Sequence, residues 1–139
     1  MAGNITTDPH WVCPYVAQSM GARFSPDACT AFGLTNSSDG LVAGVVFENW
    51  NGRSIVAHMA VTGRLTRKYL GAIFRYAFIQ CGVGKVILPV SSGNAKSIRF
   101  VEHLGFAEEA RIKDADPLGD IIIFTLEKSA CRFLGEEYG

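Results

Sequence analysis

The segment from Ser54 to Phe106 limits the possible folds more than any other part of this sequence. Its pattern predicts a strand over Ser54–Val61, a helix over Thr66–Cys81, a strand over Val83–Ser91 and a helix over Asn94–Leu104. A strand, a helix and a second strand in this order form a parallel pair with a right-handed crossover. The loop before the first helix then lies at the carboxyl end of the pair, where free N–H groups of a helix attract anions. We therefore expect a phosphate-bearing ligand at this end.

Pro89 is the one residue of the second strand that conflicts with a central position in a sheet. The rest of Val83–Ser91 is nearly all apolar, which is typical of a strand covered on both faces. Proline cannot donate to a ladder and is excluded from central strands. The conflict is removed if this strand pairs with Ser54–Val61 only at the beginning and separates from it before Pro89. Such a separation leaves unpaired backbone groups for a ligand.

The rest of the chain predicts a single mixed domain of the α+β class. Its expected elements are a helix from Pro9 to Met20 that Pro14 kinks or restarts, a meander formed by the strands Ala28–Leu34, Leu41–Glu48 and Ser54–Val61, and a final hairpin of Ala110–Lys113 and Ile121–Glu127. Residues 1–8 are expected to be flexible, and residues 128–139 to form a C-terminal tail with one or two helical turns over Lys128–Leu134. At 139 residues, the chain is long enough for one core but not for two.

Composition excludes several classes of protein. The chain has 13 basic and 13 acidic side chains, so it has no general field for nucleic acid or anionic membrane. Its apolar runs are too short to cross a bilayer, and no signal-peptide pattern opens it, so we expect a cytoplasmic protein. The four cysteines are widely spaced and form no metal-ligand pattern. We expect reduced thiols and no metal.

Residues 90–106 carry the clearest resemblance to a known family. They have the sequence VSSGNAKSIRFVEHLGF, which resembles the "V…N..a..f.e.lGF" block of the GCN5-related N-acetyltransferase (GNAT) superfamily. The order of elements over residues 28–127 is also similar to that family. More narrowly, the chain resembles small GNAT-like proteins of tailed bacteriophages, through Tyr76-Ala77-Phe78, the Leu104-Gly105-Phe106 end of the block and the ending Cys131-Arg132-Phe133-Leu134. That origin would place it in the host cytoplasm.

The resemblance implies a GNAT-like fold and acetyl transfer from acetyl-CoA, as cosubstrate, to a small-molecule or protein amine. The acceptor itself is unknown, and a homodimer is one open alternative. In the family, acetyl-CoA lies between the two separated parallel strands. Carried over to this chain, the pantetheine would run along Met59, Ala60 and Val61 with Asn94 close to it, and the pyrophosphate would lie near Arg64, Thr66, Arg67 and Lys68.

Two departures from the family pattern put catalysis in question. The phosphate loop lacks the family's paired glycines, and Val101 stands where the family often has a general-acid tyrosine. A proton donor would then be water, Ser91 or Ser92. The alternative is a weak catalyst, or a non-catalytic module that binds acyl-CoA or protein on the same scaffold.

Two residues are candidates for the base that deprotonates the amine. Glu48 ends the strand before the hairpin and could act through a water molecule. His58 lies in the middle of the next strand, on the face of Val56 and Ala60, and histidine titrates near neutral pH.

Overall fold

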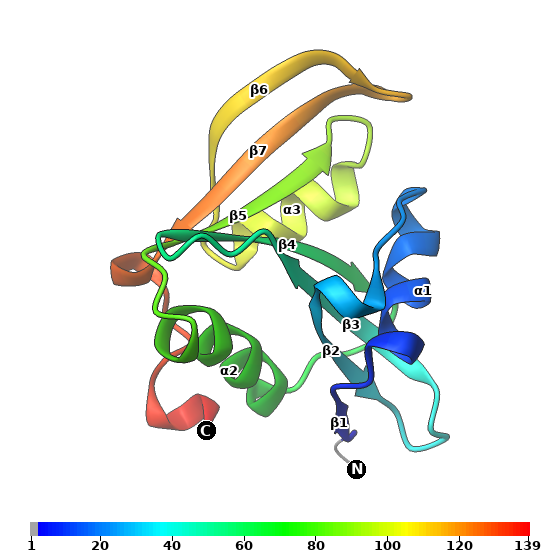
Figure 1. Ribbon diagram of the computed structural model, residues 1–139, viewed down its shortest axis with the longest axis vertical. Helices are drawn as coiled ribbons and strands as arrows, with labels where there is room; N and C mark the ends of the chain where they lie inside the picture. Colours follow the sequence, from blue (N-terminus) through cyan, green and yellow to red (C-terminus); the bar gives the residue numbers. More distant parts are fainter. Residues whose placement is uncertain (1–2) are drawn as a thin grey trace.

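A computed structural model describes residues 3–139 and shows a seven-stranded mixed sheet with three α-helices (Figure 1). The strand order is β1-β2-β3-β4-β5-β7-β6. The strands are β1 (Ile5–Thr6), β2 (Thr30–Thr35), β3 (Leu41–Glu48), β4 (Ser54–Val61), β5 (Lys85–Ser91), β6 (Ala107–Asp116) and β7 (Gly119–Glu127). The helices are α1 (Pro9–Met20), α2 (Arg67–Arg75) and α3 (Ala95–His103). Short 3-10 turns cover Pro26–Ala28, Lys128–Ala130 and Glu136–Tyr138, and a π-helical turn covers Tyr76–Gln80.

The pairing confirms the two main topological predictions. β2, β3 and β4 form an antiparallel meander. β4 and β5 are parallel and pair at only three positions, from Ser54↔Lys85 to Val56↔Ile87. Pro89 is paired only with β7, where it lies opposite Ile123. The strand β5 therefore keeps its β7 neighbour along its whole length but loses β4 before Pro89, as the missing N–H requires.

Helix α1 covers one face of β2, β3 and β4. Val12, Cys13 and Val16 are buried against this face. Gly33 and Gly44 permit the close approach, because a Cβ on either would lie 2.8 Å from a valine methyl group of α1. The helix has Asp8 as its N-cap and ends at Gly21, which has a left-handed φ of 64°. It runs through Pro14 as one helix, so the predicted restart does not occur.

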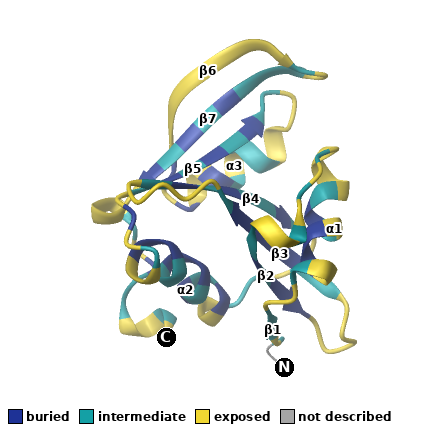
Figure 2. Ribbon diagram, in the orientation of Figure 1, coloured by how far each residue is buried: buried dark blue, intermediate teal, exposed yellow. Residues whose placement is uncertain are grey.

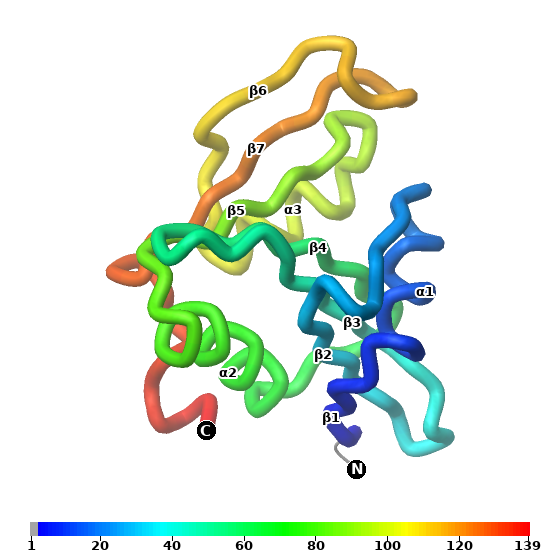
Figure 3. The backbone as a smooth tube through the Cα atoms, viewed as in Figure 1, coloured from blue at the N-terminus to red at the C-terminus, as the bar shows by residue number. Residues whose placement is uncertain are grey.

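Helices α2 and α3 share the larger core on the opposite face. Tyr69, Ile73 and Phe74 of α2 and Val101 of α3 are buried there, together with inward side chains of β3, β4, β5 and β7. The strand β6 is exposed along nearly all of its length, and the β6–β7 hairpin extends away from the body (Figure 2). The tube view shows β4 and β5 close together at their beginnings and diverging toward their ends (Figure 3).

Several predicted boundaries are corrected by the structure. The strand expected at Ala28–Leu34 starts at Thr30, because Pro26–Ala28 forms a 3-10 turn. The helix expected to run to Cys81 ends at Arg75 and widens into the π-helical turn, in which the Cys81 N–H bonds the Tyr76 carbonyl at 2.8 Å. β5 begins at Lys85 rather than Val83.

Strand pairing near both ends of the chain extends further than the sequence predicts. Ile5 and Thr6, inside the segment expected to be flexible, pair with β2, while residues 1 and 2 of that segment lie outside the described part. The final hairpin extends over Ala107–Glu127, because its strands continue past the short apolar pattern that predicted them. In the tail, the turn Lys128–Ala130 lies within the predicted segment Lys128–Leu134, whereas the turn Glu136–Tyr138 lies beyond it and was not predicted.

Tyr69 gives the fold a measurable dependence on alkaline pH. Its ring is buried, its hydroxyl donates to the Phe32 carbonyl at 2.7 Å, and burial raises its pKa above the ordinary 10.0. Above pH 10 the unfolded chain releases this proton while the folded chain retains it. The free energy of unfolding should therefore fall by about 1.4 kcal/mol per pH unit from this group. Urea unfolding of the wild type and Tyr69→Phe from pH 8 to 11 should show a flatter profile for the variant. Parallel profiles would contradict this assignment.

Candidate functional site

The site is built around the unpaired edge of β4. After Val56, this strand has no partner on its β5 side, although β3 continues to pair with it as far as Val61. The backbone of Met59, Ala60 and Val61 therefore presents one hydrogen-bonding edge to the opening between β4 and β5. The three residues predicted to contact the pantetheine lie on this edge. An extended amide-bearing chain is the kind of ligand that such an edge binds.

The loop after β4 leads directly to the N-terminus of α2. Thr66 is the N-cap, and its hydroxyl accepts the Tyr69 N–H at 3.1 Å. The N–H groups of Arg67 and Lys68 have no hydrogen-bond partner among residues 3–139. The side chains of Arg64, Arg67 and Lys68 are exposed and form no ion pair with the part of the chain that the structure describes. Three exposed cations and two free amides therefore lie at one helix end in a chain of zero net charge, and their role as a phosphate site stays a prediction.

The β5 side of the opening ends in a second capped helix. The Asn94 side chain accepts the Ser97 N–H at 3.1 Å and caps α3, so its predicted cap role is confirmed, while a ligand contact stays a prediction. The Ser91 hydroxyl donates to Asp116 at 2.7 Å, and the Ser92 hydroxyl accepts the Asp120 N–H at 2.8 Å. Both serines suggested as proton donors are therefore engaged with the β6–β7 hairpin.

The structure brings the two predicted base residues into contact. His58 Nε2 lies 2.7 Å from Glu48 Oε2, with 16% and 29% of the respective side chains exposed. Because an ionised carboxylate only accepts, Nε2 carries the hydrogen, and in the neutral form of the ring Nδ1 has the free lone pair. The Phe24 ring packs 4.9 Å from the imidazole ring. His58 is two residues beyond Val56, the last β4 residue paired with β5, so the dyad lies on the α1 face where the two strands begin to separate.

Tyr15 is a site residue that sequence reasoning missed. Its hydroxyl is 2.7 Å from the hydroxyl of Thr62, which directly follows β4. The contact places a phenol from α1 at the carboxyl end of the unpaired edge. In the sequence, Tyr15 is one of several apolar positions at helical spacing, and only the docking of α1 over the glycines of β2 and β3 reveals its position.

Val101 contributes no polar group to this opening. It is buried in the core under α3, and its carbonyl accepts the Phe106 N–H at 3.1 Å. Val101, which stands where the GNAT family often has a tyrosine, therefore packs in the core as an apolar side chain.

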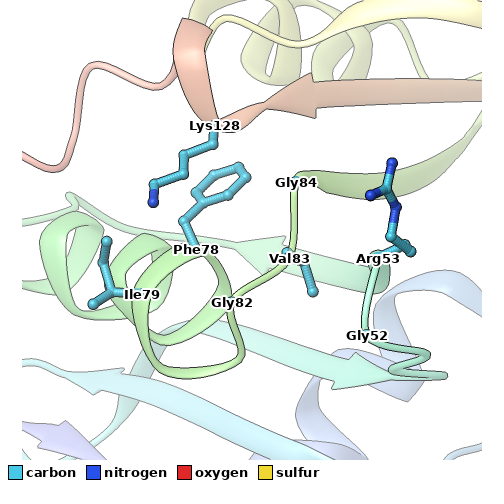
Figure 4. Close-up of a pocket in the computed structure, with 8 residues that line it drawn as sticks. All are labelled: Gly52, Arg53, Phe78, Ile79, Gly82, Val83, Gly84 and Lys128. Carbon is cyan, nitrogen blue, oxygen red and sulfur yellow. The ribbon is translucent and has the colours of Figure 1, made fainter.

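A separate surface hollow lies at the other end of the same strands. Its volume is about 440 Å³, and its lining residues are Gly52, Arg53, Phe78, Ile79, Gly82, Val83, Gly84 and Lys128 (Figure 4). Arg53 and Gly84 precede β4 and β5, so this hollow is at the amino ends of the strands, whereas the cation loop follows the carboxyl end of β4. It contains none of the predicted site residues.

Two further features of the described chain bear on function. Residues 3–139 contain no group of three or more His, Cys, Asp or Glu side chains placed to hold a metal ion. None of the helices in this range combines the length and apolar character needed to cross a membrane.

Comparison with solved structures identifies the fold as that of the GNAT superfamily. The spermidine N-acetyltransferase of Vibrio cholerae, solved in complex with CoA and spermine, aligns with a TM-score of 0.72 and 16% identity over 96% of this chain and 99% of that chain. The spermidine/spermine N-acetyltransferase SpeG of the same organism, solved with manganese ions, aligns with a TM-score of 0.70 and 16% identity over 92% and 94% of the two chains.

Comparison of the sequence alone finds no match. No protein-family model and no curated protein matches this chain. The predicted α+β, GNAT-like fold is therefore confirmed by structure, and the narrower resemblance to bacteriophage proteins stays a prediction.

Proposed function

We propose that this protein transfers an acetyl group from acetyl-CoA to a primary amine. The observation that carries the proposal is the opening between β4 and β5, which has an unpaired strand edge, a Glu48–His58 dyad where it begins and a cationic helix end beside it. Two neighbours of the same fold are N-acetyltransferases by description, and one is bound to CoA and spermine, which supports this reading of the opening.

The chain's own residues supply what acetyl transfer to an amine requires. The amine must lose a proton, and its nitrogen then attacks the thioester carbonyl carbon, the C–S bond breaks and CoA leaves as a thiol. The Nδ1 atom of His58 is the proton acceptor, and the Glu48 carboxylate stabilises the imidazolium that forms. Backbone N–H groups of the unpaired β4 edge are available to the developing oxyanion.

The leaving thiolate needs little help from an acid. A thiol has a pKa of about 8.5, so the thiolate is a good leaving group near neutral pH. Water or the Tyr15 hydroxyl can protonate it, and the buried Val101 has no part in the step. Loss of the family's tyrosine is therefore compatible with turnover, which we expect to be slow.

The acceptor we propose is a cationic amine, either a small molecule or a protein side chain. The β5 side of the opening meets the β6–β7 hairpin, where the Asp116 carboxylate accepts the Ser91 hydroxyl and the Asp120 N–H donates to the Ser92 hydroxyl. The Asp116 carboxylate forms no ion pair among residues 3–139 and therefore favours a positively charged acceptor on this side. The spermine bound by the Vibrio cholerae enzyme is an amine of this kind.

The direct test is acetylation of a panel of amines with acetyl-CoA, followed by mass spectrometry of the acceptors. We expect acetylated product from at least one polyamine or lysine-containing peptide, at a rate that depends on protein concentration. If no acceptor gains an acetyl group while CoA still binds, the chain is the non-catalytic module instead. The specific observation that favours this second function is the apolar Val101 in the core.

Arg67→Ala should weaken CoA binding. Arg67 lies in the first turn of α2 with its guanidinium exposed, and a charge-assisted hydrogen bond to a phosphate contributes about 1.5–3 kcal/mol. We therefore expect the Kd for CoA to rise by roughly 10–100-fold in calorimetry. Arg99→Ala, an exposed cation elsewhere on α3, is the matched control and should leave the Kd unchanged. Unchanged affinity in a triple alanine variant of Arg64, Arg67 and Lys68 would show that the phosphate site is misplaced.

A further inference from the structure

Cys13 and Cys29 form a thiol pair that the proposed chemistry does not use. Their Sγ atoms are 3.3 Å apart, although the residues are 16 positions apart in the chain. Cys13 lies buried in the middle of α1, and the half-buried Cys29 lies between the first 3-10 turn and β2. Both belong to the core that α1 forms with the sheet, as does Phe24, whose ring contacts His58.

We propose that Cys13 and Cys29 are a redox modification site, at which a low-molecular-weight disulfide converts the two thiols into an intramolecular disulfide. The Cys29 thiolate, the more exposed of the two, attacks the reagent disulfide and releases one reagent thiol. The Cys13 thiolate then attacks the Cys29 sulfur and releases the second. Two protein thiols are oxidised and one reagent disulfide is reduced, so electrons and protons balance.

The two sulfur atoms already lie close to each other. A disulfide has an S–S distance of about 2.05 Å, so the two sulfur atoms must approach by roughly 1.3 Å. Cys81 and Cys131 are also free thiols, but the structure places neither within bonding distance of another sulfur in residues 3–139. Cys29 is adjacent to β2, so the link would fasten α1, and with it Tyr15, to the sheet beside the dyad.

The test is oxidation of the full reduced chain with glutathione disulfide, followed by alkylation and peptide mass spectrometry. We expect the Cys13–Cys29 linked peptide to exceed every pairing of Cys81 or Cys131 by at least about tenfold, because the fold holds these two sulfurs together. In concentrated urea this excess should disappear. Recovery of Cys13 and Cys29 only as free thiols or glutathione adducts, or equal yields of all pairings in the native chain, would overturn the proposal.

Stability supplies a second measurement that does not depend on acetyl transfer. A link closing a loop of this size should raise the melting temperature by roughly 5–12 °C. Cys13→Ser should abolish both the linked peptide and the shift, whereas Cys81→Ser should retain both. A linked protein that melts at or below the temperature of the reduced protein would show that the fold does not accommodate the bond, and would also overturn the proposal.

Discussion

His58→Ala should lower kcat for acetyl transfer by about 10²–10⁴-fold at neutral pH, with little change in the KM for acetyl-CoA. In the neutral imidazole, Nε2 donates to Glu48 at 2.7 Å, so Nδ1 holds the lone pair that takes the amine proton in the proposed mechanism. Glu48→Gln keeps an acceptor for that Nε2 hydrogen but removes the charge, so its loss should be smaller, roughly 10–100-fold. His103→Ala, at an exposed position near the end of α3, is the control and should retain wild-type kinetics.

The pH profile separates a base from a structural residue. A primary amine has a pKa of about 10.4, so at higher pH the acceptor increasingly arrives already deprotonated. The deficit of His58→Ala should then shrink by up to about tenfold per pH unit as the pH approaches the pKa of the amine. A deficit that is constant with pH, or wild-type rates in both variants, would contradict the assignment of the dyad as the base.

Phe124→Ala should reduce the free energy of unfolding by about 3–5 kcal/mol, a large part of the roughly 5–15 kcal/mol available to a domain of this kind. Phe124 is fully buried, and its strand β7 pairs with both β5 and β6 at this position. Removing the ring leaves a cavity under β7, the central strand of the β5-β7-β6 part of the sheet. The melting temperature should fall by roughly 10–20 °C.

Leu118→Ala is the matched control for this substitution. Leu118 lies in the β6–β7 turn with a relative exposure of 73%, so its truncation should change stability by less than about 0.5 kcal/mol. Equal effects of the two substitutions in urea unfolding would show that the core is not packed as described.

The strands β3 and β4 and the separation of β4 from β5 could be predicted because local rules determine them. β3 and β4 are short, apolar and joined by a turn that contains Asn51-Gly52, and their bounds agree residue for residue with the prediction. The separation could be inferred from Pro89, which has no N–H for a ladder, and the pairing of β5 with β4 does end before it. The π-helical turn after α2 could not be predicted, because its residues continue the apolar spacing of the helix. It differs from the helix only in its backbone hydrogen bonds, such as the one from the Cys81 N–H to the Tyr76 carbonyl five residues earlier.

Several residues of the candidate site could be named from the sequence, but Tyr15 and the arrangement of the site could not. Glu48 and His58 were each identified separately, and their contact depends on the register of the β3–β4 pair, in which Val46 lies opposite His58. Tyr15 and the Cys13–Cys29 pair depend on the way α1 crosses the sheet over Gly33 and Gly44. Such contacts between distant segments leave no periodic signal in the sequence.

Calorimetric titration of the full chain with CoA and acetyl-CoA, with a simple nucleotide as control, tests the central claim most directly. Both CoA species should give saturable heat. If a cation of the loop before α2 contacts the 3′-phosphate, dephospho-CoA should bind more weakly than CoA. Higher salt should weaken the binding of all three ligands. The nucleotide should bind more weakly than CoA because it cannot use the unpaired edge of β4. Absence of saturable heat with either CoA species, at protein concentrations that detect a Kd of about 1 mM, would contradict the account.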